Sequence, residues 1–181
     1  MARQIFQLKV SLDGVRPPVW RRVRVPGGYT LDRVHRVIQY AMGWGGYHLH
    51  SFEIGGEQYG EPDPDGDLEL IDELDVRLDA VARAGARLRY TYDYGDWWEH
   101  TVDVEDVRDA DPDEAYPLCV DGQGACPPED VGGAYGYAEL LTVLRDPAHP
   151  EYETARQVLG SGRSTESFDA RLATTLLRRL A

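Results

Sequence analysis

A change in the spacing of apolar residues near the start of the chain constrains the fold more than any other feature. Apolar and polar residues alternate from Ile5 to Leu12 and again from Val19 to Val25, which is the period of a half-buried β-strand. A Pro-Pro pair interrupts the chain between the two runs, so we expect the strands to pair across this loop. From Leu31 to Met42 the apolar residues recur every three or four positions, which predicts an amphipathic helix that ends at Gly43. The predicted order strand, strand, helix is typical of an α+β fold.

The clearest β-hairpin lies in the middle of the chain. The runs Arg87 to Tyr94 and Trp97 to Val107 alternate on either side of Gly95-Asp96, a dipeptide that favours a tight turn. A shorter strand is predicted from His48 to Ile54, ahead of a glycine turn. We therefore expect a mixed or antiparallel sheet of about five strands.

The last third of the chain is predicted to be helical and to cover the sheet as a C-terminal layer. Its predicted helices, which show apolar residues at helical spacing, span 135–144, 151–159 and 168–180. A length of 181 residues suits one domain, so we expect a single domain over 1–181. Its predicted parts are a sheet-rich part (1–107), a long loop rich in Pro, Gly and Asp (108–133) and a helical part (134–181).

The composition narrows the location and the partners of the protein. The chain has no apolar run long enough to cross a membrane and its first residues enter a strand pattern, so we expect a cytoplasmic bacterial protein without membrane contact. The formal net charge of −13 opposes non-specific binding to nucleic acid, because such binding needs clustered cations. The two cysteines, Cys119 and Cys126, are expected to be free thiols or metal ligands in a reducing compartment.

Five short segments, in order and spread over nearly the whole chain, are similar to those of one known family. They are Pro17–Arg22, His48–Phe52, Tyr92–His100, Gly124–Asp130 with Gly132-Gly133, and Asp146–Pro150. On these segments the chain resembles the plasmid pRiA4b ORF-3-like family. It departs from the family pattern at Trp97, where relatives commonly carry Asp, and at Val131, where many carry Cys. The resemblance implies a compact α+β domain, and some relatives are described as accessory or passenger proteins of transposable elements. It implies no particular reaction.

Three histidines and two cysteines form the first candidate site. His48 and His50 lie on one face of a predicted strand, and a third imidazole would join them if this strand neighbours the strand of His100. Together with Cys119 and Cys126 they form a set of ligands that zinc prefers. The six-residue gap between the cysteines differs from that of a zinc knuckle, and histidines that face aromatic residues often serve as hydrogen-bonded packing residues. Both interpretations therefore stay open.

The tip of the aromatic hairpin forms the second candidate site. Asp93, Asp96 and His100 offer carboxylates and an imidazole for general acid–base catalysis, although turn chemistry and cross-strand packing explain the same residues. The aromatic rings of the tip are suited to anchor a ligand or a partner protein. The predicted binding residues are Trp20, Arg22, Tyr92, Tyr94, Trp97, Trp98, Glu129 and Asp130.

Two charged segments suggest further binding sites. The basic residues Arg21, Arg22 and Arg24 beside Trp20 offer an aromatic surface for DNA, although the net charge opposes this. An acidic loop resembles a calcium-binding loop in its spacing, but a solvated loop explains it as well. The residues that carry this pattern are Glu61, Asp63, Asp65, Gly66 and Asp72.

The sequence favours a non-catalytic binding module over an enzyme. The expected site is a groove between the aromatic hairpin and residues 119–133, and the expected partner is a small molecule or another protein, in a role accessory to a plasmid or a transposable element. The first alternative is a zinc-dependent enzyme that uses the histidines and cysteines. The second alternative is a DNA-binding accessory protein.

Overall fold

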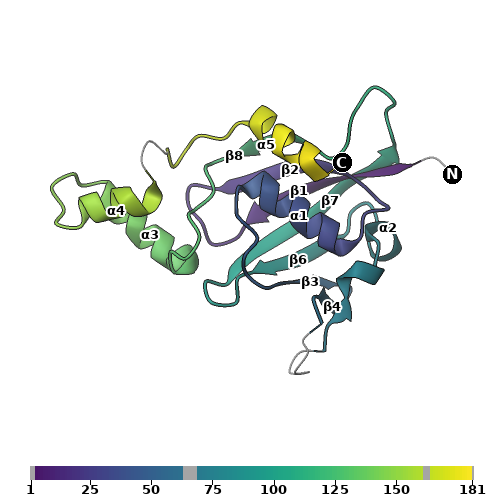
Figure 1. Cartoon of the computed structure of the whole chain (residues 1–181), viewed down its shortest axis with the longest axis horizontal. Coiled ribbons are helices and arrows are strands. Elements are labelled where there is room, and N and C mark those ends of the chain that lie inside the picture. The colour runs from purple at the N-terminus through teal and green to yellow at the C-terminus, as the bar shows by residue number, and fades with distance from the viewer. Residues whose placement is uncertain (1–2, 63–68, 161–163, 181) are drawn as a thin grey trace.

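The structure, a computed structural model, describes residues 3–62, 69–160 and 164–180 of the chain. Across these residues it contains one eight-stranded sheet, with helices on one of its faces (Figure 1). The strands are β1 (Gln4–Leu12), β2 (Val19–Pro26), β3 (His50–Ile54), β4 (Glu57–Gly60), β5 (Ile71–Asp72), β6 (Arg87–Tyr92), β7 (Trp98–Asp109) and β8 (Leu118–Gln123). The helices are α1 (Leu31–Met42), α2 (Leu78–Val81), α3 (Gly133–Leu144), α4 (Tyr152–Leu159) and α5 (Ala170–Leu177), with 3-10 turns at Glu73–Asp75 and Arg178–Leu180.

The strand order is β5-β4-β3-β6-β7-β1-β2-β8. Neighbouring strands run antiparallel from β4 to β8 along this order, and β4 pairs with β5 in parallel. The mixed sheet and the α+β class are confirmed. The expected count of about five strands is wrong, because β4, β5 and β8 were not predicted. β4 and β5 are too short to show an alternating period, and β8 lies inside the segment that was predicted to be a long loop.

The opening of the chain folds as its periodicity predicts. β1 and β2 pair from Ile5 opposite Pro26 to Leu12 opposite Val19, and α1 follows. The helix ends at Gly43, whose φ of 100° is in the left-handed region that glycine favours. Thr30 precedes the helix, and its hydroxyl bonds to the Asp32 side chain instead of capping a backbone N–H group.

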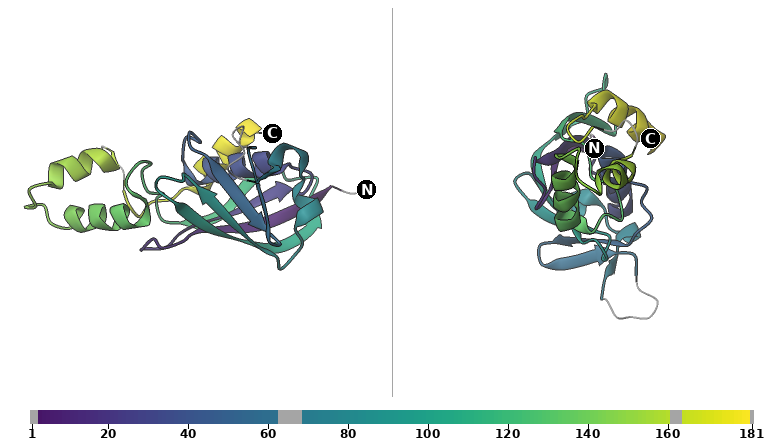
Figure 2. Two further views of the ribbon diagram at one scale, coloured as in Figure 1. Left: turned by 90° about the horizontal axis from the view of Figure 1, so that it is seen from below. Right: turned by 90° about the vertical axis from the view of Figure 1, so that its left-hand side faces the viewer.

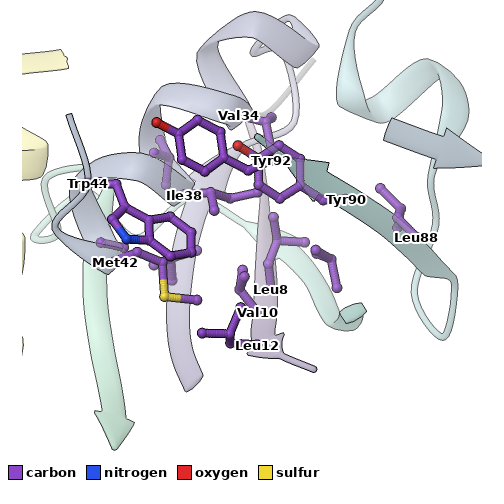
Figure 3. Close-up of a cluster of buried hydrophobic side chains, with 14 of the residues drawn as sticks. Leu8, Val10, Leu12, Val34, Ile38, Met42, Trp44, Leu88, Tyr90 and Tyr92 are labelled. Carbon is purple, nitrogen blue, oxygen red and sulfur yellow. The ribbon is translucent and has the colours of Figure 1, made fainter. Parts of the chain in front are cut away.

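The main core lies between the helical layer and one face of the sheet. The apolar face of α1 packs on the inward side chains of β1, β6 and β7, and residues from both layers are fully buried (Figure 3). The other face of the sheet is polar and carries ion pairs between strands, such as Arg22 on β2 with Glu105 on β7 at 2.6 Å and Arg89 on β6 with Glu99 on β7 at 2.6 Å. The chain is thus a two-layer structure with one polar, open sheet face.

The C-terminal helices do not form one layer as expected. α5 packs beside α1 and against β8, whereas α3 and α4 form a hairpin that extends away from the end of the sheet (Figure 2). α5 begins at Ala170 because the Asp169 side chain accepts hydrogen bonds from the N–H groups of Arg171 and Leu172. Among the described residues, no helix combines the length and the apolar composition needed to span a bilayer.

Candidate functional site

A polar cluster interrupts the core between α1 and β6. The Tyr90 side chain is fully buried, and its hydroxyl lies 2.8 Å from Gln39 Nε2 and 2.8 Å from His35 Nδ1. Gln39 Nε2 donates to the hydroxyl oxygen, so the hydroxyl proton has His35 Nδ1 as its acceptor. His35 must then carry its own proton on Nε2. Burial raises the pKa of Tyr90 well above its usual value, which keeps this hydroxyl protonated.

Two imidazole rings stack beside this cluster. The ring centroids of His35 and His50 lie 3.5 Å apart, with 9° between the ring planes. His50 Nε2 lies 2.8 Å from Glu73 Oε2, and both side chains are almost completely buried. Burial, followed by the nearby charges of His50 and Arg36, lowers the pKa of His35 to about 3. His35 is therefore a neutral hydrogen-bonding group at physiological pH, and a weak base.

His35, Gln39, His50 and Glu73 line a cavity of about 660 Å³, which we call the His35 cavity. Other parts of its wall come from Trp44 and Gly46. Gln39 is 4% exposed, and its Oε1 has no hydrogen-bond partner among the described residues. A Cβ atom at Gly46 would lie 3.9 Å from this Oε1 and 4.0 Å from His35 Nε2, so both atoms face the same small space. Cavities of this size accommodate small organic ligands.

A second cluster joins three loops at the end of the sheet. His48 lies just before β3, Asp93 in the turn after β6, and Asp130 in the loop before α3. His48 Nε2 lies 3.3 Å from Asp130 Oδ1 and 3.7 Å from Asp93 Oδ2, and one ligand atom from each residue lies within 4.8 Å of the others. We call this group the His48 cluster. Both aspartates have left-handed backbone conformations, with φ of 60° and 57°.

Hydrogen bonds fasten the hairpin tip to the loop that carries Asp130. The Tyr92 hydroxyl donates to Glu129 Oε1 at 2.5 Å, and Glu129 Oε2 accepts from the Gly45 N–H group. The Asp96 carboxylate accepts hydrogen bonds from the N–H groups of Val131 and Gly132. Of the predicted binding and catalytic residues, Tyr92, Glu129 and Asp96 thus hold the site together.

The five predicted zinc ligands do not come together. The third imidazole was to join only if the strand of His50 neighboured the strand of His100, and this condition is not met, because β6 lies between β3 and β7 and places the Tyr90 ring between the two imidazoles. His50 pairs instead with Glu73. His48 is the member of the set that joins a cluster, and it does so with two aspartates.

His100 and the cysteines lie elsewhere in the core. His100 is 1% exposed, with Nδ1 lying 3.1 Å from the Trp98 carbonyl oxygen. Burial lowers the pKa of His100 to about 4 and raises that of Cys119, on β8, to about 11. Cys126 lies in the wall of a different cavity, beside the end of α1. His100 lies next to the backbone oxygens of Tyr90 and Trp98, whereas the Asp93 carboxylate accepts from Gly95 and the Asp96 carboxylate from Val131 and Gly132. Among the described residues, no side-chain hydrogen bond links the predicted catalytic trio.

The predicted aromatic surface divides between the core and the exterior. Trp98 is fully buried, whereas Trp97 is 56% exposed and packs against the Tyr94 ring at 5.6 Å. Trp20 lies on the open sheet face, where Lys9 and Arg22 stand over its ring.

The arginines of the predicted basic surface are either buried or paired with carboxylates. Arg21 is 1% exposed and donates to the backbone oxygen of Ala41, while Arg22 pairs with Glu105 and Arg24 with Glu114. In the predicted calcium loop, Asp63, Asp65 and Gly66 lie outside the described residues. Glu61 lines the His35 cavity, and the Asp72 side chain accepts from the Leu74 N–H group.

Sequence reasoning did not single out His35, Gln39 or Glu73. One signal was available, since His35 and Gln39 lie one helical turn apart on a helix whose other inward positions are apolar. Glu73 belonged to an acidic segment that looked uniformly solvated.

Comparisons with known proteins agree with the fold. The model of the family described as "Plasmid pRiA4b ORF-3-like protein" matches residues 4–173. The chain is 42% identical over 163 residues to the uncharacterized protein y4hQ of Sinorhizobium fredii. The match covers 89% of this chain and 84% of that relative. It is also similar to the crystal structure of MM3350, a protein of unknown function from Methanosarcina mazei Go1. The TM-score is 0.87 at 36% identity, and the match covers 94% of this chain and 98% of the other.

Proposed function

This chain belongs to the plasmid pRiA4b ORF-3-like family, and from that premise we propose that it is a non-catalytic module that binds a small, planar, polar molecule in the His35 cavity. The family resemblance predicts a role accessory to a plasmid or a transposable element, and this role stays a prediction.

The observation that carries the proposal is the unpaired oxygen of Gln39. Gln39 is 4% exposed and its Oε1 has no hydrogen-bond partner among the described residues, and Gln39 belongs to the wall of a cavity of about 660 Å³. A buried acceptor without a donor costs about 1–3 kcal/mol of stability. Buried polar groups in native proteins are rarely left in this condition. A ligand N–H group in the cavity would supply the missing donor.

The cavity offers one donor and one acceptor side by side. His35 Nε2 carries a proton because Nδ1 accepts from Tyr90, and Gln39 Oε1 accepts, so a ligand should present a carbonyl oxygen next to an N–H group. If the side-chain amide of Gln39 were rotated by 180°, Gln39 would be the donor and His35 Nε2 the acceptor, and the ligand would still need a donor next to an acceptor. Trp44 adds an aromatic wall suited to a flat ring. A cyclic amide edge, as in uracil, combines these features.

The charges around the cavity favour a neutral ligand over an anion. Its described wall contains one guanidinium group, that of Arg36, and the carboxylates of Asp32, Glu61, Asp72 and Glu73. His35, with its pKa lowered to about 3 by burial, adds no positive charge at neutral pH and is a poor general base. Binding therefore fits this arrangement better than acid–base catalysis does.

The test uses uracil as the probe and NMR amide shifts as the readout. Uracil should shift the resonances of Gln39, Trp44 and Gly46, whereas 1,3-dimethyluracil, which lacks N–H donors, should not. Gln39→Leu should abolish the uracil shifts, and Gln58→Leu on the exposed surface of β4 is the matched control that should retain them.

Two results would overturn the proposal. One is the absence of shifts in these residues at uracil concentrations up to about 10 mM, where a ligand of this size reaches the weak end of measurable affinity. The other is a set of uracil shifts that persists unchanged in the Gln39→Leu variant.

A further inference from the structure

The His48 cluster has the separations of a metal-ligand set. An ion bound to nitrogen and oxygen atoms at about 2.0–2.1 Å in tetrahedral geometry places those atoms roughly 3.4 Å apart. His48 Nε2 lies 3.3 Å from Asp130 Oδ1 and 3.7 Å from Asp93 Oδ2. All three ligand atoms lie within 4.8 Å of one another. The Asp130 side chain is 76% exposed, so it has room to rotate when the set closes around one ion.

The buried carboxylate of Asp93 is the second observation that points to a cation. Its side chain is 9% exposed. Oδ1 accepts from the Gly95 N–H group at 2.9 Å, whereas Oδ2 receives no hydrogen bond from the described residues and faces His48 Nε2. A carboxylate on a side chain that is only 9% exposed is partly desolvated, so a positive charge beside it is favourable, and a metal ion placed between Oδ2 and the imidazole supplies one.

The net charge of the His48 cluster differs between a protonated His48 and a bound metal ion. A protonated His48 between Asp93 and Asp130 leaves the cluster with a net charge of −1. A divalent ion with a neutral imidazole and two carboxylates gives a net charge of zero. Because one of the carboxylates is buried, the neutral arrangement is the more favourable of the two.

The ligands are held by contacts outside the cluster. The Asp93 N–H group donates to the Leu49 oxygen at 2.8 Å, which fixes the turn beside the segment that carries His48. The loop of Asp130 is fastened through Glu129 to Tyr92, and through Val131 to Asp96. A site whose ligand-bearing segments are fixed in this way loses less conformational freedom when an ion binds.

From these observations we propose that His48, Asp93 and Asp130 bind one divalent transition-metal ion, of which zinc is the representative. The imidazole nitrogen selects for this class over magnesium and calcium, which prefer all-oxygen ligand sets. His48 is 28% exposed and Asp130 76% exposed, so the outer side of the ion remains open to water or to a fourth ligand.

The test measures metal binding to the full-length protein, purified without a metal-affinity tag and dialysed against a chelator. Calorimetric titration with Zn²⁺ should give about one equivalent, and Co²⁺ should give visible absorption of a low-symmetry site. Asp93→Asn should weaken binding at least about tenfold, and Asn tolerates the left-handed backbone at this position. His48→Gln should do the same. Asp106→Asn, on the exposed end of β7, is the matched control and should leave binding unchanged.

Two results of these titrations would contradict the proposed metal site. The proposal fails if the protein takes up less than about a tenth of an equivalent of Zn²⁺ at concentrations near 0.1 mM, a result that leaves an ordinary ion-pair cluster. It also fails if the stoichiometry and affinity are the same in Asp93→Asn and in Asp106→Asn, because the metal then binds elsewhere. Circular dichroism of each variant confirms that loss of binding is not loss of folding. Uracil binding is scored separately, so the two proposals stand or fall independently.

Discussion

The ring of Tyr92 stands edge-on to the ring of His48, with centroids 5.7 Å apart, and its other side stacks on Trp44 at 5.1 Å. Trp44 belongs to the wall of the His35 cavity and His48 to the second cluster. One tyrosine on β6 therefore lies between the two candidate sites, and its hydroxyl fastens the loop that completes one of them.

Removing this hydroxyl should destabilise the protein measurably. Tyr92→Phe leaves Glu129 Oε1 and the Tyr47 N–H group without their present partner, so we expect the free energy of unfolding to fall by about 1–3 kcal/mol. Urea denaturation followed by tryptophan fluorescence measures the change. Tyr94→Phe is the matched control, since the Tyr94 hydroxyl makes no hydrogen bond with the described residues, and equal effects of the two substitutions would contradict the expected role.

Arg21 should matter far more to stability than its neighbour in sequence. Its guanidinium donates to the backbone oxygens of Ala41, Trp20 and Gln123, and it is 1% exposed. Arg21→Met keeps most of the volume but leaves one buried and two partly buried backbone oxygens without this donor, so we expect a loss of about 2–5 kcal/mol. Arg22→Met removes the surface ion pairs with Glu105 and Asp121 and should cost about 1 kcal/mol or less. Similar losses for both variants, measured by urea denaturation, would place Arg21 outside the core.

These two arginines show how far the sequence determines the fold. Strand alternation places Arg21 on the same side as the valines of β2, and the structure confirms that this side is buried. The same periodicity predicts β1, α1 and the hairpin of β6 and β7. It does not predict β8, because that strand contains Gly and Asp and forms through pairing with β2, an interaction that local sequence does not encode.

The candidate sites are harder to predict because they depend on strand order. His48, Asp93 and Asp130 were each singled out, but as parts of three different hypotheses, and periodicity gives no reason to group a residue before β3 with one before α3. The insertion of β6 between β3 and β7 also separates the imidazoles of His50 and His100, which lie on different strands. The sequence pattern predicts the side of the sheet to which a side chain points, but it does not predict which strands lie next to each other in the sheet.

The position of α5 in the helical layer gives a test of the C-terminal architecture. Leu177 is fully buried where α5 packs near α1, whereas Leu172 on the same helix is 60% exposed. Leu177→Ala should therefore lower the free energy of unfolding by about 2–5 kcal/mol, as expected for a large-to-small change in a core. Leu172→Ala should change it by about 0.5 kcal/mol or less. Chemical denaturation of the two variants measures the difference, and the reverse order would show that α5 docks through its other face.

Stability should fall as the pH drops from 6.5 towards 4, because of His100. Its Nδ1–H group points to the backbone oxygens of Trp98 and Tyr90, while Nε2 is buried without a partner among the described residues. Protonation would create a buried cation with an unsatisfied donor, and burial accordingly lowers the pKa to about 4. The unfolded chain, in which histidine titrates near 6.5, takes up the proton first, so acid favours unfolding over this range.

The size of this pH effect follows from the two pKa values. A difference of about 2.5 pH units corresponds to about 3 kcal/mol, present in full above pH 6.5 and lost progressively towards pH 4. His100→Asn keeps a donor near the position of Nδ1 but cannot titrate, so its free energy of unfolding should fall less steeply with acid than that of the unmodified protein. Denaturant titrations at pH 7, 6, 5 and 4 measure both slopes. NMR signals of the His100 ring that titrate above pH 6, or equal slopes for the two proteins, would show that this imidazole is not held neutral by its surroundings.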